Sequence, residues 1–263
     1  MRGCICPHPP LLIPEIGGPA SLARVEATNR GMQALANDLG ELETVVVVSP
    51  HSPSYADAHV VKVAPRLRGD FANFGCPQAA FAFDNDPALV DLLLALAGGD
   101  RQVVLVPGED DLLDHGVLVP LSFLRPQRLV SLSIVNAYGE HRALGQLVRR
   151  CAEEAGRDVV FLASGDLSHR LTTDAPAGYD PRGTTFDEVV VRAAENGDLA
   201  ALTALDRRVV GGAGECGLRS IIALAGFLGD DARVDPHVYS YEGPFGVGYL
   251  VARFGRPKQQ AAA

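Results

Sequence analysis

Residues 44–51 have the sequence TVVVVSPH, and this stretch decides the fold of the chain. Four valines in a row, without alternating polar residues, are typical of a strand that is buried on both faces of a parallel sheet. Ser49 and Pro50 end the run, so His51 is expected where the strand ends. Comparable apolar runs lie at residues 4–6, 103–106, 129–135 and 159–163. These runs predict four further strands.

Segments with helical patterns lie between the predicted strands. Residues 21–39 form one, with Ser21 as a candidate N-cap and Gly40 after its end. Others cover 87–97 and 141–155 and the apolar run from Glu215 to Phe227. We expect an edge strand at 59–64, a polar loop from there to residue 86, and a C-terminal hairpin from 238–241 and 246–254. This alternation predicts an α/β protein with three layers, a central mostly parallel sheet flanked by helices.

Composition limits the classes of protein to which the chain can belong. No linker divides the 263 residues, so we expect one domain over 1–257 and a disordered tail over 258–263. The formal charge is −9 and no basic run is present, which argues against a nucleic-acid partner. No apolar run reaches the roughly 20 residues that span a membrane. Five cysteines without a C-x-x-C pair favour the cytoplasm. A small-molecule substrate is the remaining expectation.

Four of the seven histidines follow predicted strands: His8, His51, His115 and His169. The other three lie within predicted elements or at the start of a strand. Ligands of open α/β sheets collect at the carboxyl ends of the strands, where the loops converge. The four histidines are therefore predicted to share one site.

Glu215 follows the glycine-rich residues 211–214 at the start of a helix. Two imidazoles and one carboxylate form the facial triad of non-haem Fe(II) enzymes, so we predict a metal site made of His8, His51 and Glu215. Zn(II) with three ligands and a water is the alternative. The helix dipole also favours a carboxylate in this position without any ligand role. Cys216 is expected to be a small buried hydrophobe.

The order of short motifs resembles the class III extradiol ring-cleavage dioxygenases, in particular the catalytic β subunit of protocatechuate 4,5-dioxygenase. The resemblance rests on PHPPL at 7–11, PH at 50–51, DHG at 114–116, SGDLSH at 164–169 and GE at 214–215. It extends over nearly the whole chain. The same superfamily contains the Memo-like proteins, which are not dioxygenases.

The resemblance implies that His8, His51 and Glu215 bind Fe(II), that His169 is the acid/base, and that His115 hydrogen-bonds the substrate or the oxygen intermediate. It implies a phenolic or catecholic substrate and O2, with a homo-oligomer or a small accessory subunit as further partners. Memo-like relatives use a cysteine near the position of Cys216, so a metal-binding or interaction protein without ring cleavage is one alternative. A zinc hydrolase is another, although the H-E-x-x-H helix of many such enzymes is missing.

Overall fold

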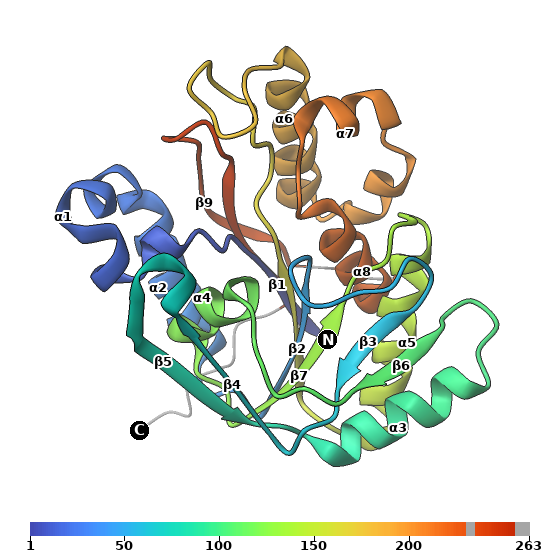
Figure 1. Ribbon diagram of the computed structural model, residues 1–263. Coiled ribbons are helices and arrows are strands. Elements are labelled where there is room, and N and C mark those ends of the chain that lie inside the picture. The colour runs from blue at the N-terminus through green and yellow to red at the C-terminus, as the bar shows by residue number, and fades with distance from the viewer. Residues whose placement is uncertain (230–234, 256–263) are drawn as a thin grey trace.

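One eight-stranded sheet forms the centre of the computed structural model, which describes residues 1–229 and 235–255 (Figure 1). The strand order is β6-β3-β7-β2-β8-β1-β10-β9. Its strands are β1 (Arg2–Cys6), β2 (Thr44–Ser49), β3 (His59–Lys62), β6 (Leu105–Gly108), β7 (Arg128–Ser133), β8 (Val159–Ser164), β9 (His237–Glu242) and β10 (Tyr249–Phe254). The four central strands β7, β2, β8 and β1 are parallel, which confirms the predicted fold class. The expected tail at 258–263 lies outside the described residues.

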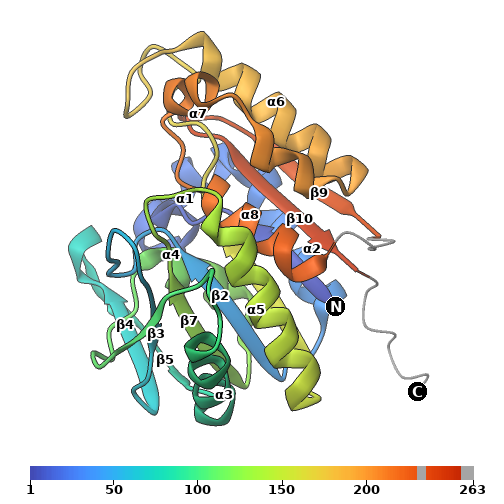
Figure 2. The ribbon, with the colours of Figure 1, turned by 90° about the vertical axis from the view of Figure 1, so that its right-hand side faces the viewer.

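Helices cover both faces of this sheet and make the three layers (Figure 2). The helices are α1 (Pro14–Arg24), α2 (Glu26–Leu39), α3 (Pro87–Gly98), α4 (His115–Leu124), α5 (Glu140–Ala155), α6 (Pro181–Asn196), α7 (Arg207–Ala213) and α8 (Leu218–Leu228). Val46 and Val48 face the core that contains α3, α5 and α8, whereas Val45 and Val47 face the core that contains α2 and α4. Because successive side chains of a strand point to opposite faces, the valine run supplies both cores. Within the described residues, no helix is long and apolar enough to cross a membrane.

Three local predictions were wrong. Residues expected to form a loop make a two-stranded sheet of β4 (Arg66–Phe71) and β5 (Cys76–Asp84). Much of β5 is exposed, so its polar side chains concealed the strand. β3 is not an edge strand, because β6 lies outside it. The helix predicted at 21–39 is two helices that meet at Val25, and Ser21 lies within the first.

The path to His115 also differs from the expected one. β3 is antiparallel to β7 and β6 is parallel to β3, so β6 runs opposite to the central strands. The carboxyl end of β6 is therefore at the other edge of the sheet from His8 and His51. The segment after β6 returns alongside β4, where Arg68 exchanges backbone hydrogen bonds with Asp111 and Leu113. His115 reaches the site through this return segment and not from a strand end.

Candidate metal centre

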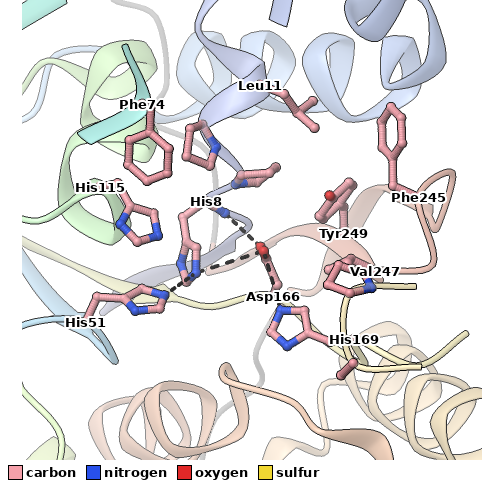
Figure 3. A pocket seen from close by; sticks show the side chains of 14 residues that line it. His8, Leu11, His51, Phe74, His115, Asp166, His169, Phe245, Val247 and Tyr249 are labelled. Atoms are coloured by element: carbon pink, nitrogen blue, oxygen red, sulfur yellow. Dashed lines mark hydrogen bonds and ion pairs between the residues drawn. The ribbon is translucent and has the colours of Figure 1, made fainter. Parts of the chain in front are cut away.

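Three neighbouring parallel strands end at the same edge of the sheet and carry site residues. β8 lies between β1 and β2 and is parallel to both. His8 follows β1, His51 follows β2, and Asp166 and His169 follow β8. Figure 3 shows their side chains around one space. The strand-end prediction is therefore confirmed for three of the four histidines.

The imidazoles of His8, His51 and His115 form a close cluster. Each offers a ring nitrogen, and these atoms all lie within 4.8 Å of one another. The Nε2 atoms of His8 and His51 are 3.0 Å apart, and the ring centroids of His51 and His115 are 4.2 Å apart. Two nitrogens bound at about 2.1 Å and at a right angle to one ion lie about 3.0 Å apart. The spacing of His8 and His51 therefore fits two ligands of a single metal ion.

Hydrogen bonds hold His8 in the form that binds metals. Its Nδ1 lies 2.9 Å from Ser164 Oγ, and this hydroxyl donates its own proton to the carbonyl oxygen of Gly116. Ser164 Oγ can therefore only accept from Nδ1–H, which leaves the lone pair of the neutral ring on Nε2. The backbone N–H of His8 donates to Asp166 Oδ1 at 2.9 Å. Both contacts direct Nε2 of His8 toward His51.

The electrostatics of the cluster favour the neutral forms of His51 and His115. Partial removal from water, together with the neighbouring rings of His8 and His115, lowers the pKa of His51 to about 4. The pKa of His115 is also lowered, first by removal from water and then by His8. Neutral imidazole is the form that donates a lone pair to a divalent ion. Both rings are thus available as ligands at neutral pH.

Asp166 lies between the cluster and His169. Its Oδ2 atom is 3.9 Å from Nε2 of His8 and 3.9 Å from Nε2 of His169. His169 Nδ1–H donates to the carbonyl oxygen of Gly214 at 2.7 Å, so its Nε2 faces the site. Burial acts to lower the pKa of His169, but the nearby carboxylate of Asp166 outweighs it, and that pKa is raised. Asp166 thus favours the protonated form of His169 while the Gly214 carbonyl keeps the ring in place.

A cavity of about 590 Å³ opens beside these residues. His8, His51, His115, Asp166 and His169 all line it, and most of its other lining residues are apolar. Its volume lies in the range of cavities that enclose small organic ligands. The arrangement can hold a divalent ion at the inner wall and an organic molecule in front of it.

Comparisons with known proteins agree with this geometry. Residues 3–252 match the family model described as the catalytic LigB subunit of aromatic ring-opening dioxygenase. The chain belongs to the LigB family. The recognition made from the short motifs is thereby confirmed, and the match covers nearly all of the sequence.

One relative of this LigB-family chain and one solved structure with the same fold bear names that state no activity. Protein CA_C1420 of Clostridium acetobutylicum is 32% identical over 268 residues, which cover 95% of this chain and 56% of that protein. The chain thus spans little more than half of that relative. The crystal structure of an uncharacterized protein, JW3007 from Escherichia coli K12, superposes with a TM-score of 0.66 at 18% identity. The superposition covers 97% of this chain and all of JW3007, and it supports the fold alone.

The predicted ligand Glu215 is not part of the histidine cluster. Its Oε1 accepts from Tyr138 Oη at 3.0 Å, and its Oε2 accepts from the backbone N–H of Leu218 at 2.6 Å. The carboxylate therefore caps the start of α8, which is the role that the helix dipole favours. Burial raises the pKa of Glu215, against the effect of these donors. A ligand role for Glu215 stays a prediction that its observed contacts do not support.

Cys216 is closer to the cluster than its predicted role as a core hydrophobe suggested. Its Sγ lies 3.5 Å from His8 Nε2 and accepts from the backbone N–H of Asp166 at 3.3 Å. Burial raises the pKa of the Cys216 thiol well above its usual value. Spacing in the sequence could not separate it from Glu215, because the two are adjacent and only the backbone turn before α8 decides which side chain faces His8.

No sequence pattern predicted the aromatic wall of the cavity. The ring of Phe74, in the turn of the unpredicted β4–β5 hairpin, lies edge-on to His115 with a centroid distance of 5.1 Å. Another side of the cavity is lined by Phe245 and Val247, in the loop before β10, and by Tyr249, the first residue of β10. β10 is antiparallel to β1, so its start lies next to the carboxyl end of β1 and thus next to His8. Only strand pairing brings these residues to the site.

Proposed function

We propose that this chain is a non-haem Fe(II)-dependent extradiol dioxygenase that opens a catechol-type ring with O2. The observation that carries the proposal is the cluster of three histidines on the wall of a mainly apolar cavity, in a member of the LigB family. Nε2 of His8 and Nε2 of His51 are the proposed first two ligands. Zn(II) is the alternative ion for the same nitrogens.

The donor set accepts iron or zinc, because neutral imidazole suits both ions. When bound, a redox-active ion would bring the diol and dioxygen together and allow electrons to pass between them. The protein supplies the remaining parts of the chemistry. His8 is oriented by Ser164, and the apolar side of the cavity limits access of water to the ring.

His169 is the proposed acid/base. The Gly214 carbonyl fixes its ring, and Asp166 stabilises the protonated form, so Nε2 can accept a proton from a hydroxyl group of the substrate. His115 lies between His51 and Phe74, where its free nitrogen can donate to or accept from the bound molecule. Both histidines line the cavity, so each can act directly on the bound molecule.

Replacement of His169 tests the proposal. His169→Ala should keep iron and still bind a catechol, while oxygen uptake falls by about 10²- to 10⁴-fold, the range of general acid–base groups. His237→Ala, at an exposed position in β9, is the matched control and should leave uptake unchanged. Iron content, catechol binding and oxygen uptake are measured on the same preparations. Loss of iron would make His169 a ligand, and normal uptake would exclude it as the acid/base.

A specific observation favours a second candidate, a Memo-like metal-binding protein without ring cleavage. Cys216 Sγ lies near Nε2 of His8, whereas both oxygens of Glu215 are hydrogen-bonded elsewhere. Metal content of anaerobically purified Glu215→Gln and Cys216→Ser separates the two candidates. Loss of metal only in the Glu215 variant supports the dioxygenase triad. Loss only in the Cys216 variant supports the Memo-like alternative.

A further inference from the structure

The charge of the cavity wall restricts the molecules that it can accept. Across residues 1–229 and 235–255, no lysine or arginine side chain lines the cavity. The acidic side chain of Asp166 does line it, with Oδ1 held by the N–H of His8. A ligand that carries a carboxylate on its substituent would therefore lose water without gaining a lysine or arginine partner, and it would face the like charge of Asp166. Both effects weaken binding.

Arg24 contacts a residue of the cavity wall but does not itself line the cavity. The Arg24 guanidinium lies 3.9 Å from the ring centroid of Phe245 and donates to the carbonyl oxygen of Pro244. Phe245 lines the cavity and Arg24 does not. The aromatic ring thus presents an apolar surface to the ligand while the cation stacks against it from another side.

The apolar part of the wall has room for more than a bare ring. Leu11, Phe74, Phe245 and Val247 surround the space in front of the histidines (Figure 3). Cavities of this volume commonly enclose ligands of drug size. Aromatic and aliphatic walls favour apolar substituents through burial of their surface from water.

We propose that the site selects a neutral catechol with an apolar substituent and rejects catechols that carry a carboxylate. This selectivity rests on the proposed function, because it takes the diol to be the group that faces the histidines. It would separate this chain from protocatechuate 4,5-dioxygenase, whose substrate is an acid. The reason is that no lysine or arginine is among the described residues that line the cavity.

Equilibrium binding without oxygen tests the selectivity independently of turnover. Calorimetry on the Fe(II)-loaded protein compares 4-ethylcatechol with 3,4-dihydroxybenzoate, two probes that share the diol and differ in the substituent. We expect 4-ethylcatechol to bind at least about tenfold more tightly, as like-charge repulsion and an unpaired carboxylate predict. Equal affinity, or tighter binding of the acid, would overturn the inference and leave ring cleavage unaffected.

A charge placed in the wall should reverse the preference. Leu11→Lys should strengthen binding of 3,4-dihydroxybenzoate and weaken that of 4-ethylcatechol, whereas Leu11→Gln should not favour the acid. Val104→Lys, at an exposed position outside the cavity, controls for the change in net charge. Failure of Leu11→Lys to improve binding of the acid would count against the inference.

A second pair of probes separates failure of the selectivity from failure of the proposed function. 4-Ethylphenol and 4-hydroxybenzoate carry the same substituents on a ring without a diol. If neither catechol binds but 4-ethylphenol binds at least about tenfold more tightly than 4-hydroxybenzoate, the diol chemistry is wrong and the apolar selectivity stands. If neither neutral probe binds, the selectivity is overturned.

Discussion

The histidines of this molecule include two groups whose surroundings differ: one lines a cavity, and the other is buried in the core. His8, His51 and His115 direct ring nitrogens toward one another and line a cavity. His59 and His141 are buried, with ring centroids 5.2 Å apart at 89°, and line no described cavity. The first group is available to a ligand, and the second belongs to the packing.

Hydrogen-bond partners explain the difference. His141 uses both nitrogens on the backbone, since Nδ1 lies 3.2 Å from the carbonyl oxygen of Tyr138 and Nε2 accepts from the N–H of Val135. His59 Nδ1 donates to the carbonyl oxygen of Ser133. In His8, by contrast, Ser164 occupies only Nδ1 and leaves Nε2 facing other imidazoles. His59 Nε2 is also without a hydrogen-bond partner but is buried, so metal binding needs a free nitrogen that also lies beside other ligand atoms on the wall of a cavity.

Removal of a ligand from the first group should have the largest effect. His51→Ala should lower metal affinity by more than about 100-fold. Loss of a residue that only hydrogen-bonds a ligand costs about 10- to 100-fold, and loss of the ligand itself should cost more. The free energy of unfolding of the metal-free protein should change by less than about 1 kcal/mol, because His51 is exposed to the cavity. Metal titration and urea unfolding measure the two effects. Full metal occupancy in this variant would remove His51 from the ligand set.

The second group should respond in the opposite way. His141→Ala leaves the N–H of Val135 without its partner and opens a cavity in the core, so unfolding should become easier by about 2–4 kcal/mol. Metal affinity should stay within about threefold of wild type, because His141 is outside the ligand cluster. Urea unfolding of metal-free protein and metal titration of folded protein check both statements. A metal loss equal to that of His51→Ala would show that the groups are not independent.

Removal of the Ser164 hydroxyl, which orients His8, should have an intermediate effect on metal affinity. Ser164→Ala removes the acceptor that keeps the proton on Nδ1, so metal affinity should fall by about 10- to 100-fold. Ser168→Ala is the matched control, because Ser168 Oγ donates to the Ala213 carbonyl and not to a histidine. Competition with a metal chelator measures the affinities. Equal losses in the two variants would refute the orientation of His8 by Ser164.

The last prediction concerns the dependence of stability on pH. Burial, followed by the charge of His59, lowers the pKa of His141 to about 3. Between the ordinary pKa near 6.5 and about 3, the unfolded chain binds the proton and the folded chain does not. The resulting stability is therefore complete above pH 6.5 and is lost as pH falls. This histidine should add about 1.4 kcal/mol per pH unit to the slope of stability against pH.

Metal-free His141→Asn should have a shallower slope than wild type between pH 6 and pH 4. Urea unfolding at several pH values measures the difference in slope, which is unaffected by the constant cost of the substitution. An identical slope would mean that His141 is already protonated in the folded protein.

Sequence patterns predicted much of the fold and part of the site. The valine run of β2, the strands on either side and the histidines after β1, β2 and β8 follow from local sequence, because burial on both faces excludes polar residues from a strand. The same reasoning failed for the β4–β5 hairpin, whose exposed residues carry no such pattern. With the hairpin, Phe74 was missed as well.

By itself, the sequence determined the fold class, the LigB-family resemblance and the separation of His8 and His51 from His59 and His141. Tertiary structure alone decided how His115 reaches the cluster, which of Glu215 and Cys216 faces His8, and which residues wall the cavity. The physical reason is that hydrophobic periodicity records whether a side chain is buried. It does not record strand direction, or the backbone turn that chooses between two adjacent side chains, and both depend on contacts between segments far apart in the chain.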